Sequence, residues 1–107
     1  PTIRDENGLA VSSRNAFLSD QERDAAYILF QSLSKAREMI IAGQCDTRTI
    51  RNRIMKMLGD SDLISVDYIS LSKLNSLKEL TIIEKPVLIS LAVTIGNTRL
   101  IDNIIVE

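Results

Sequence analysis

Apolar and polar residues follow a helical period along the first half of the chain. Between Ser19 and Gly43 the apolar positions recur every three or four residues, which predicts a helix over about residues 20–42. Ser19 and Glu22 have the spacing of a capping box at its start, and Gly43 is a typical C-terminal stop. The apolar face of this helix comprises Ala26, Leu29, Phe30, Leu33, Ala36 and Ile40.

A second helix is predicted between Asp46 and Gly59. The Asp46 side chain can accept from the first backbone N–H groups, and Gly59 ends the helical pattern. The apolar face comprises Ile50, Ile54, Met57 and Leu58. The remaining sides carry Arg48, Arg51, Arg53 and Lys56, which is typical of a solvated helix face.

After Gly59 the period changes to two, which predicts strands. A first strand is expected around Val66 and Tyr68, followed by a loop over residues 72–85 with at most one turn of helix. The alternation is strongest over residues 87–95, where Val, Ile and Leu alternate with Ser, Ala and Thr.

The last strand is predicted to return from a hairpin. Gly96-Asn97 has the composition of a two-residue hairpin turn, and residues 100–106 form the partner strand. Asp102 and Asn103 interrupt this otherwise apolar strand. They indicate either a bulge or hydrogen bonds to a neighbouring loop.

These elements predict an α+β domain with two layers. An irregular segment over residues 1–18, with a turn favoured at Asn7-Gly8, precedes the first helix. Two helices then pack on a small three-stranded, largely antiparallel sheet. A length of 107 residues favours a single domain. The chain starts at Pro1 rather than Met, which suggests a fragment or a processed piece.

Composition narrows the possible chemistry. The net charge of −1 argues against general nucleic-acid binding, which depends on neutralising phosphates. The single cysteine, Cys45, excludes an internal disulfide framework, and no apolar run has transmembrane length. These two observations lead us to expect a cytoplasmic location. The absence of histidine excludes Ser-His-Asp catalysis within the chain. Met39, Met55 and Met57 are interpreted as core filling.

The strongest candidate for chemistry is the polar run Ser12-Ser13-Arg14 before the first helix. Two hydroxyls and a planar guanidinium suit the oxygens of a phosphate group, and arginine stays charged at any relevant pH. The same residues are also common in solvated loops, so the run alone leaves both interpretations open.

Several motifs, in the same order, resemble the pantothenate synthetase family. The run TIRDENGLAVSSRN over residues 2–15 resembles the segment that opens the family's C-terminal domain, together with the following Leu18-Ser19 and QER at residues 21–23. Val66-Asp67-Tyr68 resembles the family's central strand. LAV at residues 91–93 and GNTRLIDN at residues 96–103 resemble its closing hairpin.

The resemblance implies an ATP-dependent ligase of the nucleotidylyltransferase-like group, in the pathway to coenzyme A. Such enzymes join pantoate to β-alanine through a pantoyl-adenylate and release AMP and pyrophosphate. Residues 1–107 would be the C-terminal lid domain of a homodimeric enzyme, without the Rossmann-like N-terminal domain that binds pantoate and β-alanine. The isolated piece is therefore expected to be inactive, with no nucleic-acid or membrane partner.

The resemblance also assigns roles to individual residues. Ser12, Ser13 and Arg14 would contact the phosphates of ATP, with Mg²⁺ bound mainly outside this piece. Ile3 and Val11 would flank the adenine through their backbone groups. Many relatives have Met where Val11 stands, and the loop lacks the lysine of the broader KMSKS pattern, so Arg14 must supply the positive charge.

Two other functions remain as alternatives at this point. One is a non-enzymatic α+β interaction module that docks a partner protein through its apolar N-terminal segment. The other is a nucleic-acid module that uses the helix from Arg48 to Lys56, which the net charge disfavours.

Overall fold

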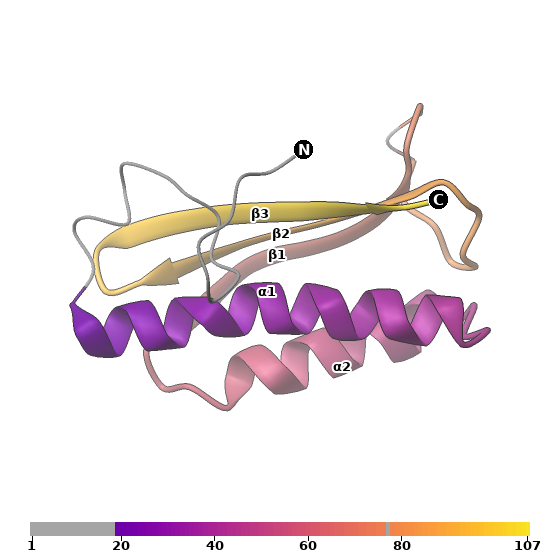
Figure 1. Ribbon diagram of the computed structural model, residues 1–107. Helices are drawn as coiled ribbons and strands as arrows, with labels where there is room; N and C mark the ends of the chain where they lie inside the picture. The colour runs from indigo at the N-terminus through magenta and orange to yellow at the C-terminus, as the bar shows by residue number, and fades with distance from the viewer. Residues whose placement is uncertain (1–18, 77) are drawn as a thin grey trace.

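The computed structural model describes residues 19–76 and 78–107. It contains two helices followed by three strands (Figure 1). Their bounds are α1, Asp20–Ile41; α2, Thr47–Gly59; β1, Ile64–Lys73; β2, Val87–Ile95; and β3, Thr98–Val106.

The described elements form two layers, as the sequence predicted. The sheet has the order β1-β2-β3 and is antiparallel throughout. Both helices lie on the same face of the sheet, with α2 against β1 and α1 against β2 and β3 (Figure 1). The prediction of two helices packed on a small antiparallel sheet is therefore confirmed.

The helices begin and end where their local sequences dictate. The Ser19 hydroxyl accepts from Glu22 N at 3.2 Å, and Glu22 Oε1 accepts from Ser19 N at 3.0 Å, which completes the capping box. Asp46 caps α2 by accepting from Arg48 N at 3.1 Å. Gly43 follows α1 with φ +104°, a conformation that glycine adopts without a steric penalty.

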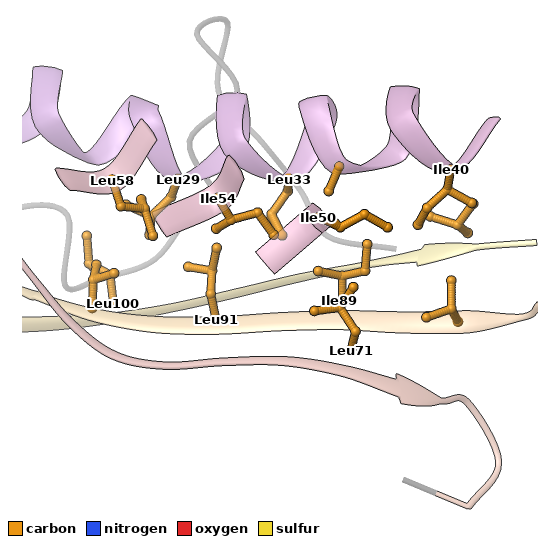
Figure 2. Close-up of a cluster of buried hydrophobic side chains, with 14 of the residues drawn as sticks. Leu29, Leu33, Ile40, Ile50, Ile54, Leu58, Leu71, Ile89, Leu91 and Leu100 are labelled. Atoms are coloured by element: carbon orange, nitrogen blue, oxygen red, sulfur yellow. The ribbon is translucent and has the colours of Figure 1, made fainter. Parts of the chain in front are cut away.

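The core lies between the helices and the central strand. Alternate residues of β2 are fully buried beneath the helices, namely Val87, Ile89, Leu91, Val93 and Ile95. Figure 2 shows leucine and isoleucine side chains of both helices pointing toward those of the sheet. The largest fully buried side chains of the described residues are aliphatic, and Tyr27 packs against them at the edge of the core. The chain has only four aromatic residues, Phe17, Tyr27, Phe30 and Tyr68.

The structure corrects several boundaries and burial expectations. β1 extends well beyond Val66 and Tyr68, and β3 starts at Thr98 rather than at residue 100. Within the described part of residues 74–86 there is a turn and two isolated bridges, and no helix. Met55 is 45% exposed and is not core filling, because it lies on the outer side of α2.

The segment after β1 joins the outer strand of the sheet to the start of α2. Leu80 N donates to Leu71 O at 2.9 Å, and Ile83 N donates to Cys45 O at 2.8 Å. The Glu79 carboxylate accepts from Ser70 Oγ at 2.6 Å, from Leu71 N at 3.0 Å and from the Arg51 guanidinium. These bonds cover part of the β1 edge, which would otherwise present unpaired backbone groups.

The β2–β3 turn lies against the first turn of α1. Gly96 has φ +60°, as the predicted two-residue turn requires. A Cβ atom added to Gly96 would lie 2.1 Å from Glu22 Oε2. Glycine at this position therefore allows both the turn and the close approach of the capping-box carboxylate.

Shortening Ile89 to alanine should lower the free energy of unfolding by about 2–5 kcal/mol, because it leaves a cavity in the core. Ile105→Ala is a matched control, since Ile89 is fully buried whereas Ile105 is 45% exposed. Urea denaturation of both variants measures the difference. Equal losses in the two variants would contradict the assignment of the core to the helix-facing side of the sheet.

Gly96→Ala should lower the free energy of unfolding by about 1–2 kcal/mol through the positive φ alone, with a further loss if the Glu22 side chain is displaced. Gly59→Ala is the control, because nothing lies within 4 Å of a Cβ there and Gly59 is in the last turn of α2. That control should be neutral or slightly stabilising. Denaturation midpoints that move equally would refute the special role of Gly96.

Candidate functional site

The residues predicted to contact ATP lie outside the described part of the chain. These are Ile3, Val11, Ser12, Ser13 and Arg14, all within residues 1–18. What the structure does describe is the point at which this segment joins the fold. That point is Ser19, the N-cap of α1.

The first turn of α1 is capped by its own side chains and is acidic. Ser19 accepts from Glu22 N, and Asp20 and Glu22 supply negative charge at the positive end of the helix dipole. A phosphate group placed directly here would meet these carboxylates. Binding of a phosphate group near this end of the molecule would therefore need cationic groups that offset these carboxylates.

A polar cluster lies near the same end, on the sheet face turned away from the helices. Asp67 is the extra residue of a β-bulge between Val66 and Tyr68 in β1. Its Oδ2 atom accepts from Arg99 Nε at 3.0 Å and from Thr94 Oγ1 at 3.2 Å. One carboxylate thus joins all three strands close to the β2–β3 turn, and it holds the Arg99 guanidinium in place.

Two surface hollows lie elsewhere among the described residues. A hollow of about 480 Å³ is found at the start of α2, where Arg51 and Glu79 form an ion pair. Another of about 550 Å³ has three carboxylates in its lining, Asp24, Asp60 and Asp62. In the first, Arg51 is paired with Glu79 and Asp46 adds a second carboxylate beside Arg48. The second is lined by three carboxylates, which repel anions.

The described residues provide no metal site of their own. In residues 19–76 and 78–107 no group of three or more His, Cys, Asp and Glu side chains is arranged to hold a metal ion. Within the same ranges no helix has both the length and the apolar character needed to cross a membrane. Cys45 is exposed and is not in a disulfide.

Sequence reasoning found the caps and the turn but not the Asp67 cluster. Asp67, Thr94 and Arg99 were separate residues in the sequence, and the bulge that brings the carboxylate across the sheet left no mark in the alternation. The sequence did contain one signal for this cluster. Asp67 and Arg99 have opposite charges and lie on β1 and β3, which both pair with β2. The arginines of α2 have different environments. Arg51 forms an ion pair with Glu79, whereas Arg48 and Arg53 are exposed on the helix surface.

Comparison with known proteins finds similarity to a single family over nearly the whole chain. Residues 1–105 match the family model described as pantoate-beta-alanine ligase. A pantothenate synthetase of Herpetosiphon aurantiacus is 47% identical over 106 residues, which is 98% of this chain and 38% of that protein. A pantothenate synthetase of Carboxydothermus hydrogenoformans is 40% identical over 107 residues, again 38% of its length.

Solved structures show the same likeness. The crystal structure of pantothenate synthetase from Thermus thermophilus is 30% identical, with a TM-score of 0.90 over 97% of this chain and 37% of that one. The pantoate-beta-alanine ligase from Francisella tularensis, complexed with beta-gamma ATP and beta-alanine, is 29% identical with a TM-score of 0.54. The likeness covers 98% of this chain and 31% of the Francisella tularensis protein.

This chain thus spans well under half the length of the curated relatives it matches, about 38%. The family model nevertheless extends over the predicted phosphate-binding run, both helices and nearly all of the sheet. With that match and the shared fold, the chain belongs to the pantoate-beta-alanine ligase family.

Proposed function

We propose that this chain is the C-terminal, ATP-closing domain of an enzyme that condenses pantoate with β-alanine. ATP would activate the pantoate carboxylate as a pantoyl-adenylate, and the β-alanine amine would then displace AMP. The observation that carries the proposal is the family match over residues 1–105, which includes Ser12, Ser13 and Arg14 ahead of the capped helix α1. The Francisella tularensis relative, complexed with beta-gamma ATP and beta-alanine, supports the choice of substrates.

Arg14 would be the principal group of this domain in the chemical step. As the α-phosphorus is attacked, negative charge moves toward the leaving pyrophosphate, and a guanidinium aimed at that charge lowers the barrier. Ser12 and Ser13 would donate hydrogen bonds to the same phosphates without adding charge. The acidic first turn of α1 supports this role for Arg14, because Asp20 and Glu22 cannot bind phosphate themselves.

Ile3 and Val11 would flank the adenine through their backbone groups. Backbone N–H and C=O groups supply hydrogen bonds whatever the side chain is. Such contacts would recognise the base while leaving its specificity insensitive to the Ile and Val side chains.

Mg²⁺ would accompany the nucleotide rather than reside on this domain. The described residues contain no group of carboxylates arranged to hold a metal, and Mg²⁺ is commonly bound through substrate phosphates with few protein ligands. We therefore assign no residue of this chain as a Mg²⁺ ligand and derive no step through the ion.

The remaining length of such an enzyme would provide the Rossmann-like domain with the pantoate and β-alanine sites. This chain would close on ATP and exclude water, which protects the adenylate from hydrolysis. The complete enzyme would be a cytoplasmic homodimer. Residues 1–107 alone would be inactive, because both acceptor substrates bind elsewhere.

Arg14→Ala, made in the complete enzyme that contains this chain, should reduce the single-turnover rate of pantoyl-adenylate formation by about 10²–10³-fold, the usual effect of losing one transition-state donor. The assay follows pyrophosphate release from ATP and pantoate, which reports adenylate formation, and then AMP release after β-alanine is added, which reports the second step. The melting temperature should hardly change, because the residue precedes the described core.

Arg53→Ala provides the matched control, since Arg53 is an exposed arginine on α2. This variant should retain the parent's adenylation rate. Near-normal adenylation by Arg14→Ala, or an equal loss in both variants, would overturn the assignment. An interaction module without catalysis would tolerate both substitutions and would release no AMP in the parent.

A further inference from the structure

The face of the sheet turned away from the helices, here called the outer face, carries apolar side chains in two rows. Tyr68 on β1 and Ile101 on β3 pair with Ala92 of β2 from either side, and they are 41% and 49% exposed. Farther along the sheet, Leu88 pairs with Ile105, which is 45% exposed. Both helices lie on the opposite face (Figure 1), so neither of them packs over these side chains.

Small polar residues lie between the two apolar rows. Ser70, Ser90 and Asn103 are paired side by side across the three strands. The β2–β3 pairing is continuous, so the bulge that the sequence allowed at Asp102-Asn103 is absent, and Asn103 lies on the outer face. The outer face therefore mixes large apolar groups with hydroxyl and amide groups.

The outer face is also poor in charge. Among the outward residues of the three described strands, Asp67 and Arg99 are the only charged ones, and they form an ion pair with each other. The surface of α2 instead carries Arg48, Arg53 and Lys56, all of them exposed. The centre of a protein interface is depleted of charged residues and enriched in tyrosine and arginine. The composition of the outer face is therefore that of an interface.

The mixture of polar and apolar groups indicates the kind of partner. Permanent homodimer interfaces are more apolar, whereas contacts between domains of one chain are more polar and allow relative motion. This chain covers about 38% of the length of its curated relatives, so in a complete enzyme a larger part of the same polypeptide would stand beside it. That part, rather than a second copy, is the occupant that fits the outer face.

The position of the outer face agrees with such a contact. Its charged end, at Asp67 and Arg99, lies near the β2–β3 turn, where Gly96 approaches the first turn of α1. Residues 1–18 join the fold at the same end, at Ser19. Because Asp67 and Arg99 are already paired, covering them costs less than covering two single charges. One closing motion would then carry the outer face and the start of α1 together toward a neighbouring domain.

We propose that the outer face is the surface through which this domain packs against the remainder of the enzyme. The inference rests on the proposed function, because that remainder is the part that would hold pantoate and β-alanine. The apolar rows supply area that leaves water on closure, and the hydroxyl and amide groups supply hydrogen bonds that water replaces on opening. Tyr68 is expected to contribute most, because interface energy is concentrated in aromatic residues and arginine.

Hydroxyl-radical labelling tests this surface through two tyrosines of the same intrinsic reactivity. Within residues 1–107 Tyr68 is 41% exposed, whereas Tyr27 is partly buried against the core. In the complete enzyme with ATP and pantoate, Tyr68 should be labelled no faster than Tyr27. Labelling of Tyr68 at several times the rate of Tyr27 would overturn the inference, whatever the activity of the enzyme.

A charge introduced on the outer face should oppose the contact. In the complete enzyme, Ile101→Lys should lower kcat/KM for ATP about tenfold or more and speed the labelling of Tyr68, because closure would bury an unpaired charge. Ile101→Thr keeps a β-branched side chain that suits a strand and should give a smaller loss. Met55→Lys is the control, since Met55 is 45% exposed on α2, and it should change neither quantity. The melting temperature of each variant distinguishes a lost contact from lost folding.

Three results separate this inference from its alternatives. Equal effects of Ile101→Lys and Met55→Lys would contradict a packing role for the outer face. If a second copy covered that face, Ile101→Lys would convert the enzyme to smaller assemblies in sedimentation, and this result would also overturn the inference. If Arg14→Ala left adenylation unchanged, the proposed function would fail, whereas slow labelling of Tyr68 would still establish the contact surface.

Discussion

The fold depends on the packing of two helices against one face of a three-stranded sheet. The five inward residues of the central strand β2 are fully buried, and on that same side α1 packs against β2 and β3 while α2 packs against β1. Each such side chain contributes about 1.5–3 kcal/mol relative to exposure, and a domain of this size has few other sources of stability. The outer strands depend on β2 for their hydrogen bonds, and the inward side chains of all three strands give the helices an apolar surface.

The parts of the fold that could be predicted from the sequence are those set by local patterns. The period-two pattern of residues 87–95 and the capping residues Ser19 and Asp46 are local signals, and each was confirmed. The ends of β1 were missed because they are set by pairing with β2, from Ile64↔Ile95 to Lys73↔Val87, and this register cannot be seen in the local pattern. Met55 was misplaced because residue type, rather than its angular position on α2, was used to judge burial.

The prediction of a phosphate-binding run rested on a different kind of signal, and it stays a prediction. Composition alone left Ser12-Ser13-Arg14 ambiguous, and only the order of several motifs along the chain favoured phosphate binding. The Asp67 cluster escaped prediction because a bulge and two antiparallel pairings must form before Asp67, Thr94 and Arg99 meet. Local patterns predict local hydrogen bonds, whereas clusters of this kind require the register of the whole sheet.

The charges at the start of α1 suggest why binding and stability are assigned to different segments. Asp20 and Glu22 stabilise the helix through its dipole and its cap, and Glu22 also lies against Gly96 in the hairpin turn. A cation needed for phosphate binding would weaken this arrangement if it replaced either acid. In the function proposed here the arginine lies upstream, at Arg14, so the carboxylates would serve the fold while the guanidinium would bind the nucleotide. An acid at Asp20 or Glu22 and a cation at Arg14 would then act on different things, the first on the helix dipole and cap and the second on the phosphate charge.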